Sequence, residues 1–337
     1  MSGRPAGESV AAFTLQFAGD ISDTLRQQVS TLLHAWQVPE ITGIARVARL
    51  AGGASNVNLK ITCEDASYAL RVCMPDSARW GVQREAAIQA QRDAAALGVA
   101  PDVIASDPAE GHLLAAFIDG TVLTPELLRR EHLLPEIAST LRRLNAGTTR
   151  ARWFSPFDDM RTFVELGSAE HAPVPAGFDA MLARAFRIEA LFRNRPMPTA
   201  FCHSDLVPQN FLLTADGFRM VDWDYAGQGW VAFEMASFCC QAGLDPAETE
   251  ELLTAYDPRL DDSQRARVEL MRLTAGVREA AWATMAEPIL AEHTTPMPGW
   301  TYTGYAAANL EQAGMVVAAG FDALLDTART VRPGARF

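Results

Sequence analysis

The spacing of apolar residues separates helical from strand-like segments along the chain. Between Ser22 and Trp36, apolar side chains recur every three or four residues, as on one face of a helix (Leu25, Val29, Leu32, Leu33). Residues 1–20 have no such periodicity, and we expect them to form a loose tail. Residues 82–97 are rich in alanine and predict a second helix, which ends at Gly98.

Two short segments with alternating character predict a β-hairpin. The glycine-rich stretch AGGASN is followed by VNLKITC, by the turn residues EDAS and by YALRVC. Successive side chains of a strand point to opposite faces, so Tyr68, Leu70 and Val72 share one face. Arg71 lies on the other face. The hairpin therefore presents a cation on its less apolar side.

The order of the remaining segments indicates an α+β protein with two lobes. Strand-like stretches at 99–106 and 112–118 complete a β-rich first part. Later helices are expected at 127–144, 179–192, 246–256 and 263–286, and later loops at 171–177 and 294–304. We therefore expect an N-terminal lobe over 1–119 and a mostly helical C-terminal lobe over 120–337, with a ligand site between them.

The segment HSDLVPQNFLLTADGFRMVDWDYAG combines polar residues with a second predicted hairpin. Ala215-Asp216-Gly217 fits a three-residue loop with glycine in the left-handed position. If the strands pair symmetrically about the middle of this loop, Asn210 lies opposite Asp222. Asp205 lies just upstream, on the loop that leads to the same end of the hairpin. The pattern gathers one amide oxygen and two carboxylates.

These hard oxygen atoms suit Mg²⁺, which takes a few protein oxygens and adds water and phosphate oxygens. A nearby carboxylate that stays free of the metal can accept a proton. An Asp–x4–Asn loop followed by a hairpin and a metal-binding Asp is the phosphoryl-transfer arrangement of protein kinases. H-x-D-x4-N alone arises by chance, and the added spacing to Asp222 is what favours function. His203 is expected to brace the loop rather than to transfer protons.

Composition limits the binding partners and the cellular compartment that we expect for this protein. The 337 residues carry a net charge of −12, so the chain as a whole repels nucleic acid phosphates. Five cysteines without a CxxC pair predict reduced thiols and no zinc site, as in cytoplasmic proteins. We find no signal peptide and no apolar window of membrane-spanning length, so no membrane insertion is expected. The sequence sets no oligomeric state.

The stretch CHSDLVPQNFLL…MVDWDYAG resembles the catalytic segment of the choline kinase and aminoglycoside phosphotransferase superfamily, which has a protein-kinase-like fold. LAGGASNVNLKI with YALRVCMP resembles the nucleotide-binding hairpin of its bacterial choline kinase-like branch. VREAAWATM and YAAANLEQ resemble the C-terminal helices of that branch. The resemblance covers residues 48–315 and implies a bilobal kinase that uses ATP and Mg²⁺.

The resemblance also implies roles at the phosphoryl-transfer end. Asp205 would orient or deprotonate the acceptor hydroxyl, and His203 would support the catalytic loop. Asn210 and Asp222 would hold Mg²⁺.

The nucleotide would then be bound by the N-terminal lobe. By the resemblance, Arg71 would contact the ATP phosphates and Glu85 would pair with Arg71. The remaining residues of the implied nucleotide site are Ser55 and Asn56, through backbone donors, and Phe117 and Ile118, around adenine.

The acceptor is predicted from aromatic residues, because eight of the twelve Trp and Tyr residues follow position 220. Aromatic faces bind quaternary ammonium groups. By the resemblance, the acceptor pocket contains Tyr225, Trp282 and Tyr305, with Asp224 as a counter-charge. Further candidates without motif support are Trp230, Trp300 and Tyr302. Each of these rings could instead be core.

We therefore expect an ATP-dependent kinase of a small, cationic, choline-like amino alcohol. An aminoglycoside, thiamine, a sugar alcohol or an amino-acid alcohol is an alternative acceptor. Trp230 and Glu234 stand where the family has Asp, which leaves a pseudokinase binding module as a second reading. A metal-dependent phosphohydrolase is a third, although only His203 lies near the acidic cluster as a further ligand. Ser204 replaces the usual Gly or Asn after the histidine.

Overall fold

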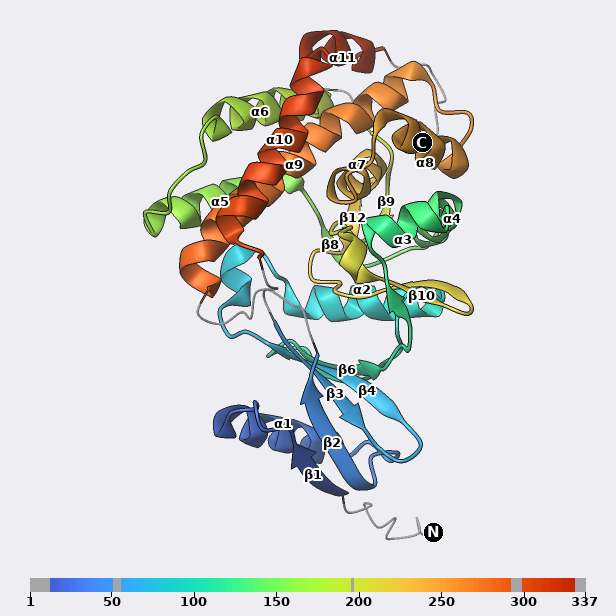
Figure 1. Cartoon of the computed structure of the whole chain (residues 1–337), viewed down its shortest axis with the longest axis vertical. Coiled ribbons are helices and arrows are strands. Elements are labelled where there is room, and N and C mark those ends of the chain that lie inside the picture. Colours follow the sequence, from blue (N-terminus) through green and yellow to red (C-terminus); the bar gives the residue numbers. More distant parts are fainter. Residues whose placement is uncertain (1–12, 51–55, 195–196, 292–298, 331–337) are drawn as a thin grey trace, which may run out of the picture.

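The computed structural model describes residues 13–50, 56–194, 197–291 and 299–330. Figure 1 shows a sheet-rich N-terminal part at one end of the molecule and a helical C-terminal part at the other. This arrangement confirms the expected α+β class with two unlike parts. No helix in the described ranges is both long and apolar enough to cross a membrane.

The N-terminal part is built on a six-stranded sheet. Its elements are β1 (Phe13–Phe17), α1 (Asp23–Trp36), β2 (Gly43–Arg49), β3 (Asn56–Thr62), β4 (Ser67–Cys73), the 3₁₀ turn η1 (Ser77–Trp80), α2 (Arg84–Ala96), β5 (Val103–Asp107) and β6 (His112–Ala116). The strand order is β1-β2-β3-β4-β6-β5, and β1 pairs with β2 in parallel. The other neighbours are antiparallel.

The expectation of a loose tail over residues 1–20 is wrong where the structure describes it. The segment FTLQF forms β1, and Phe13 to Phe17 pair with Gly43 to Val47 of β2. Its apolar residues alternate with polar ones, which is the strand period of two. The helix α1 connects the two parallel strands, as parallel pairing requires. A five-residue strand was too short to stand out against the segment around it.

A small apolar core holds the sheet and α1 together. Tyr68, Leu70 and Val72 of β4 are buried in it, on one face as predicted. From α1 it receives Val29 and Leu33, which are fully buried. The opposite face of the β3–β4 hairpin carries polar residues. It faces the C-terminal part, because Asn56 and Arg71 of this hairpin form hydrogen bonds with Asp224.

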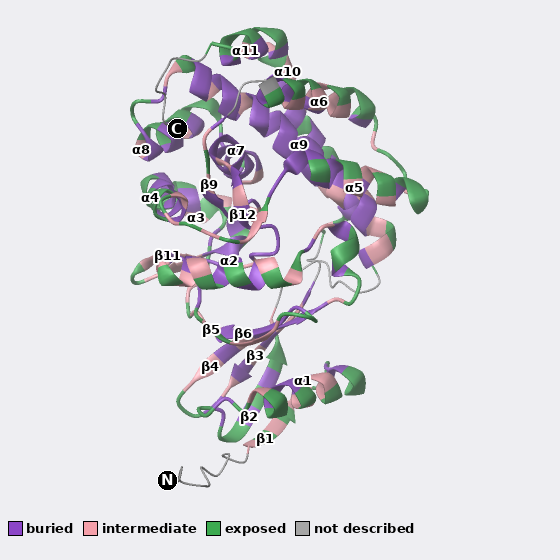
Figure 2. Cartoon of the chain, turned by 180° about the vertical axis from the view of Figure 1, so that it is seen from behind, coloured by how far each residue is buried: buried purple, intermediate pink, exposed green. Residues whose placement is uncertain are grey.

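The C-terminal part consists mostly of helices around α9. Its elements are β7 (Thr121–Val122), α3 (Pro125–Arg130), α4 (Leu134–Asn145), β8 (Arg152–Trp153), α5 (Pro156–Ala169), α6 (Phe178–Asn194), β9 (Thr199–Cys202), η2 (Pro208–Asn210), β10 (Phe211–Thr214), β11 (Gly217–Met220), β12 (Gly227–Trp230), α7 (Val231–Gln241), α8 (Pro246–Tyr256), α9 (Asp262–Leu290), α10 (Tyr302–Ala318) and α11 (Phe321–Ala328). Figure 2 shows α7 and much of α9 as buried, inside the other helices.

Three expectations for this part change. The single helix predicted over 127–144 is two helices, α3 and α4, because His132 takes a left-handed conformation (φ 53°) and α4 restarts there. The loop predicted over 294–304 ends early, because α10 begins at Tyr302 with Thr301 as its N-cap. The helices α5, α7 and α11 were not predicted.

The helix α2 lies between the two parts (Figure 1). Its buried residues Ala90 and Ala94 belong to the large core of the C-terminal part and not to the small core under the sheet. In the order of the chain, α2 thus belongs to the N-terminal part, but it packs against the core of the C-terminal part. A boundary near residue 119 remains our proposal for the division into lobes.

Candidate active site

The hairpin of β10 and β11 differs by one residue from the expected register. Thr214 pairs with Gly217, so the connecting turn has two residues and not three. Gly217 has φ 96°, which glycine adopts readily, and it enters the ladder as the first residue of β11. The prediction that Asn210 lies opposite Asp222 is wrong, because the backbone N–H of Val221 donates to the carbonyl of Asn210 (3.0 Å).

Hydrogen bonds nevertheless gather the predicted site residues at the open end of this hairpin. Asn210 Nδ2 donates to the carbonyl of Asp205 (2.9 Å). His203 Nε2 lies 2.9 Å from the carbonyl of Val221, directly before Asp222. Because a carbonyl only accepts, Nε2 carries the proton. Burial lowers the pKa of His203 to about 4, so its ring is neutral and fixes the backbone beside Asp222.

A buried glutamate supports the same loop from behind. Glu234, on α7, accepts the backbone N–H of His203 with Oε1 and that of Ser204 with Oε2, both at 2.9 Å. Burial raises the pKa of Glu234 to about 7, and the two N–H donors oppose this. Ser204 has φ 67°, where Gly or Asn is favoured, and its hydroxyl is buried without a partner in the described residues.

Asp205 is half-buried, and charged side chains of the hairpin and of α9 act on it. Its pKa is raised well above the usual range, first by burial and then by the negative charge of Glu279. Arg278 opposes this rise, while Asp222 and Asp224 add to it. Asp205 therefore lies within electrostatic reach of the hairpin acids and of an acid on α9.

Asp222 has the features of a ligand for a hard cation. Its Oδ1 is buried and lacks a hydrogen-bond partner in the described part of the chain. Burial and the charge of Asp224 raise its pKa to about 7, against the effect of Arg71. Over the described ranges, no three His, Cys, Asp or Glu residues form a metal-binding group. To hold a metal, the predicted ligands Asp222 and Asn210 would need further oxygen ligands, such as water and phosphate oxygens.

Arg71 binds Asp224 and not Glu85. Its Nη1 lies 2.5 Å from Asp224 Oδ1, and Asn56 Nδ2 donates to Asp224 Oδ2 (2.8 Å). Glu85 is exposed near the start of α2 and has no ion pair with Arg71, so that predicted contact is wrong. The reason is that α2 turns its buried face, with Ala90 among its residues, toward the C-terminal core.

The polar face of the β3–β4 hairpin also carries Lys60, which sequence reasoning missed. Lys60 pairs with Ala69 on the same face as Arg71, and its ammonium lies 3.8 Å from the centroid of the Phe117 ring. Phe117 and Ile118 follow β6 and are half-buried at the crossing between the two parts. Ser55 lies outside the described residues.

Four aromatic side chains form a cluster at the junction of α9 and α10. Trp282 lies 6.2 Å from Tyr305 and 5.9 Å from Tyr302, measured between ring centroids. Trp300 lies 4.7 Å from Tyr302 and 5.8 Å from Tyr305. The structure thus brings together two motif residues and two of the candidates without motif support.

The ring of Tyr225 packs against Phe163 (6.5 Å between centroids) and lies close to two protein cations. The Arg278 guanidinium lies 4.5 Å from its ring centroid, and Arg152 lies 5.9 Å away. Its hydroxyl donates to the carbonyl of Trp80 (3.3 Å). Trp230 is separate from the cluster, because its ring packs against Trp153 at 5.4 Å.

A charged pair on α9 links the aromatic cluster to Asp205, and sequence reasoning did not select it. Glu279 Oε2 accepts the Tyr305 hydroxyl (2.9 Å), which also contacts Gln241 (2.8 Å). Glu279 Oε1 accepts from Arg278 Nη1 (2.5 Å), and Arg278 is anchored by Asp159 (2.8 Å). The sequence could have indicated these two residues, because they begin the R-E-x-x-W pattern that ends at Trp282.

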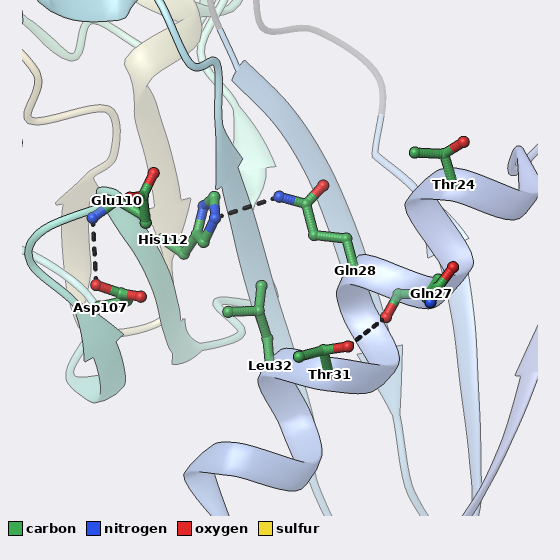
Figure 3. A pocket seen from close by; sticks show the side chains of 8 residues that line it. All are labelled: Thr24, Gln27, Gln28, Thr31, Leu32, Asp107, Glu110 and His112. Atoms are coloured by element: carbon green, nitrogen blue, oxygen red, sulfur yellow. Dashed lines mark hydrogen bonds between the residues drawn. The ribbon is translucent and has the colours of Figure 1, made fainter.

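A separate groove of about 440 Å³ lies between α1 and the β5–β6 connection, away from these residues. Figure 3 shows His112 at its floor, with Gln28 of α1 reaching toward the ring (3.2 Å). His112 Nδ1 accepts the backbone N–H of Cys73 (3.1 Å), so the ring joins α1 to the end of β4. None of the predicted site residues that the structure describes lines this groove.

Comparison with known proteins shows to which family this chain is similar. The model of the phosphotransferase enzyme family matches residues 46–270. The protein LicA of Haemophilus influenzae is 27% identical over 212 residues, which are 61% of this chain. The match covers 61% of LicA as well, less than two thirds of its length.

Two solved structures share the fold over most of the chain. One is a choline/ethanolamine kinase family protein from Mesorhizobium loti, with a TM-score of 0.72 and 21% identity, covering 90% of this chain and 98% of that one. The other is choline kinase LicA from Streptococcus pneumoniae, with a TM-score of 0.70 and 16% identity, covering 88% and 100%. At these identities the likeness concerns the fold alone.

Proposed function

Because this chain belongs to the phosphotransferase enzyme family, we propose that it transfers the γ-phosphoryl group of ATP to the hydroxyl of a small cationic amino alcohol. The observation that carries the proposal is the position of Asp205. The charges of both Asp222, which follows the β10–β11 hairpin, and Glu279, on α9, raise the pKa of its carboxyl group. A carboxylate placed between a phosphate end and an acceptor end fits the orientation of an attacking hydroxyl.

The nucleotide end is proposed from the hairpin face and the catalytic loop. Arg71 would contact phosphate oxygens with the guanidinium donors that Asp224 does not use. Asn210 and Asp222 would hold Mg²⁺, and the unpartnered Oδ1 of Asp222 fits this role. When bound, the metal neutralises charge on the phosphate oxygens.

Asp205 supplies the proton acceptor in the proposed reaction. The hydroxyl oxygen forms a bond to the γ-phosphorus while the bond from that phosphorus to the β,γ-bridging oxygen breaks and ADP leaves. The hydroxyl proton passes to the Asp205 carboxylate, whose raised pKa makes it a stronger base than an exposed aspartate. Since only the ionised form accepts a proton, the rate should rise with pH through that raised pKa.

The acceptor class is proposed from charge and aromatic surface at the α9–α10 junction. Glu279 contributes a carboxylate beside the ring of Tyr305. Trp282 and Trp300 add aromatic faces that attract ammonium groups. All four residues lie beyond residue 270, where the family match ends, so the family by itself does not specify this pocket.

The other candidate functions receive less support. A pseudokinase was considered because Glu234 replaces an aspartate, yet Glu234 accepts both loop N–H groups, which supports an ordered catalytic loop. A phosphohydrolase would use several converging metal ligands, and no such group of three exists in the described ranges. Among kinase acceptors, a polyamine such as an aminoglycoside would favour several acids facing the aromatic cluster, and Glu279 is the acid that contacts one of its rings through the Tyr305 hydroxyl.

The deciding experiment is an acceptor panel with Mg-ATP, followed by ADP release. We expect ADP formation that depends on choline or ethanolamine, because both carry a cation one short chain away from a hydroxyl. ADP formation only with thiamine, an aminoglycoside or a sugar alcohol would keep the kinase reaction and reject the proposed acceptor. Measurable Mg-ATP binding without ADP formation from any acceptor would argue for a binding module.

The acceptor site is tested by Glu279→Gln. We expect the KM for the amino alcohol to rise about tenfold with little change in the KM for ATP, because the variant removes one charge beside the ammonium group. The matched control is Glu311→Gln, the same change at an exposed position of α10. Equal KM values in wild type and Glu279→Gln would reject Glu279 as an acceptor contact.

A further inference from the structure

The N-terminal and C-terminal parts are joined by a buried ion pair between Arg71 and Asp224. Arg71 comes from β4, and Asp224 lies on the connection between β11 and β12. The two side chains are 10% and 4% exposed, and the N–O distance is 2.5 Å. Asn56, at the start of β3, donates a further hydrogen bond to Asp224.

This pair uses only part of the hydrogen-bonding capacity of Arg71. A guanidinium has five N–H donors, and Nη1 is the donor that contacts Asp224. Arg71 Nε is buried and has no partner in the described residues. A buried donor without a partner costs free energy, and a second anion beside Arg71 would satisfy it.

Carboxylates and phosphates bind a guanidinium in the same way, through parallel N–H···O bonds. Asp224 therefore presents to Arg71 the type of group that a phosphate presents. Two anions that bind one cation also repel each other, and the repulsion is strong at a buried position. The carboxylate of Asp224 and the phosphates of ATP should thus compete for Arg71.

We propose that Asp224 is a resident counter-anion of Arg71 that nucleotide phosphates displace on binding, so that this pair weakens the binding of ATP without metal. The inference rests on the proposed function, in which Arg71 contacts phosphate. It gives Asp224 a role in nucleotide selection in place of the acceptor contact expected from the sequence. It also leaves Glu85, which is exposed, without a part in this step.

The test is titration calorimetry of ATP in the presence of EDTA. Asp224→Asn keeps the size of the side chain and removes its charge. We expect this variant to bind ATP at least about fivefold more tightly than wild type, the size of effect that one charge interaction commonly has. In an Arg71→Met background, Asp224→Asn should give no gain, because the competition requires the cation.

A control variant separates this effect from general charge removal. Glu85→Gln removes an exposed acid that has no ion pair with Arg71 and should leave the EDTA affinity unchanged. An equal gain from Asp224→Asn in the wild-type and Arg71→Met backgrounds would overturn the proposal. Unchanged or weaker binding by Asp224→Asn would also overturn it, the latter indicating that Asp224 positions Arg71 and does not compete with phosphate.

A second variant keeps the test valid if Asp224→Asn fails to fold. Asn56→Ala removes one hydrogen bond from Asp224 without changing any charge, and we expect a smaller gain of the same sign. A loss of affinity would contradict the proposal. Wild-type protein that binds no Mg-ATP would overturn both proposals. Wild-type protein that binds Mg-ATP, with no gain in either variant, would overturn this inference alone.

Discussion

At the scale of single residues, the proposed chemistry depends most directly on Asp205. Asp205→Asn keeps the shape of the side chain and removes the proton acceptor. We expect turnover to fall by at least about 10²-fold, the lower range for general base catalysis, with Mg-ATP affinity within about twofold of wild type. Steady-state ADP release and titration calorimetry measure the two quantities.

The matched control for Asp205 is Asp216→Asn, the same change at the exposed turn of the same hairpin. It should leave both the rate and the affinity unchanged. A rate for Asp205→Asn close to that of wild type would remove Asp205 from the mechanism, whatever the effect on ATP binding.

Ser204 shows that a site residue can carry local strain. It has φ 67°, and its hydroxyl is buried without a partner in the described residues. Ser204→Gly should raise the free energy of unfolding by about 1 kcal/mol, because glycine adopts this conformation without the steric cost. Denaturant unfolding with a common m-value measures the change.

Ser204→Ala separates the two contributions at this position. It removes the hydroxyl but keeps the Cβ atom, so it should give less stabilisation than Ser204→Gly if backbone strain dominates. A Ser204→Gly protein less stable than wild type would show that the hydroxyl or the Cβ atom makes a favourable contact that outweighs the strain.

At the scale of elements, α7 and the loop before β10 act as one unit through Glu234. Its pKa is raised from about 4.5 to about 7, so between these values the folded state holds a proton that the unfolded state has lost. The free energy of unfolding should therefore fall as pH rises across this window, by up to about 3 kcal/mol from this group. Glu234→Gln cannot titrate and should flatten that dependence.

Denaturant unfolding at pH 5, 6 and 7 measures the slope for each protein. Glu311→Gln is the control, because it makes the same substitution at an exposed position of α10. Glu234→Gln also loses one acceptor for a buried N–H and should be less stable than wild type at pH 5. The same slope in wild type and Glu234→Gln would mean that Glu234 is ionised throughout this range.

At the scale of the whole molecule, the unit of β1 and α1 extends the sheet beyond the part that the family model matches, which begins at residue 46. Its buried residues complete the small core under β3 and β4. Leu33→Ala removes a fully buried side chain there and should cost about 2–5 kcal/mol of unfolding free energy. Thermal and denaturant unfolding report the loss.

Thr31→Ala is the control for Leu33→Ala, since Thr31 is exposed on the same helix and should change stability by less than about 0.5 kcal/mol. ATP affinity adds a functional readout, because the polar face of the same hairpin carries Arg71. A fully stable Leu33→Ala protein would show that α1 does not contribute to the folding of the sheet.

Local pattern by itself determined much of this protein. Alternation along YALRVC placed Tyr68 and Leu70 inside and Arg71 on the polar face, because the strand period of two is a property of the backbone. The order of segments predicted the α+β class, and the spacing in the catalytic segment located Asp205 and Asn210 at one end of a hairpin. These features depend on neighbours along the chain.

Contacts between residues far apart in the chain could be identified only in the tertiary structure. Which acid meets Arg71 depends on how α2 packs, and the packing selects Asp224, which is 153 residues away along the chain, over Glu85. The hairpin register differs from the expected one because Gly217 pairs with Thr214 and does not belong to the turn. The pairing of Glu279 with Tyr305 joins two helices. A sequence pattern reports periodicity and local geometry, whereas burial and charge pairing depend on the whole packed chain.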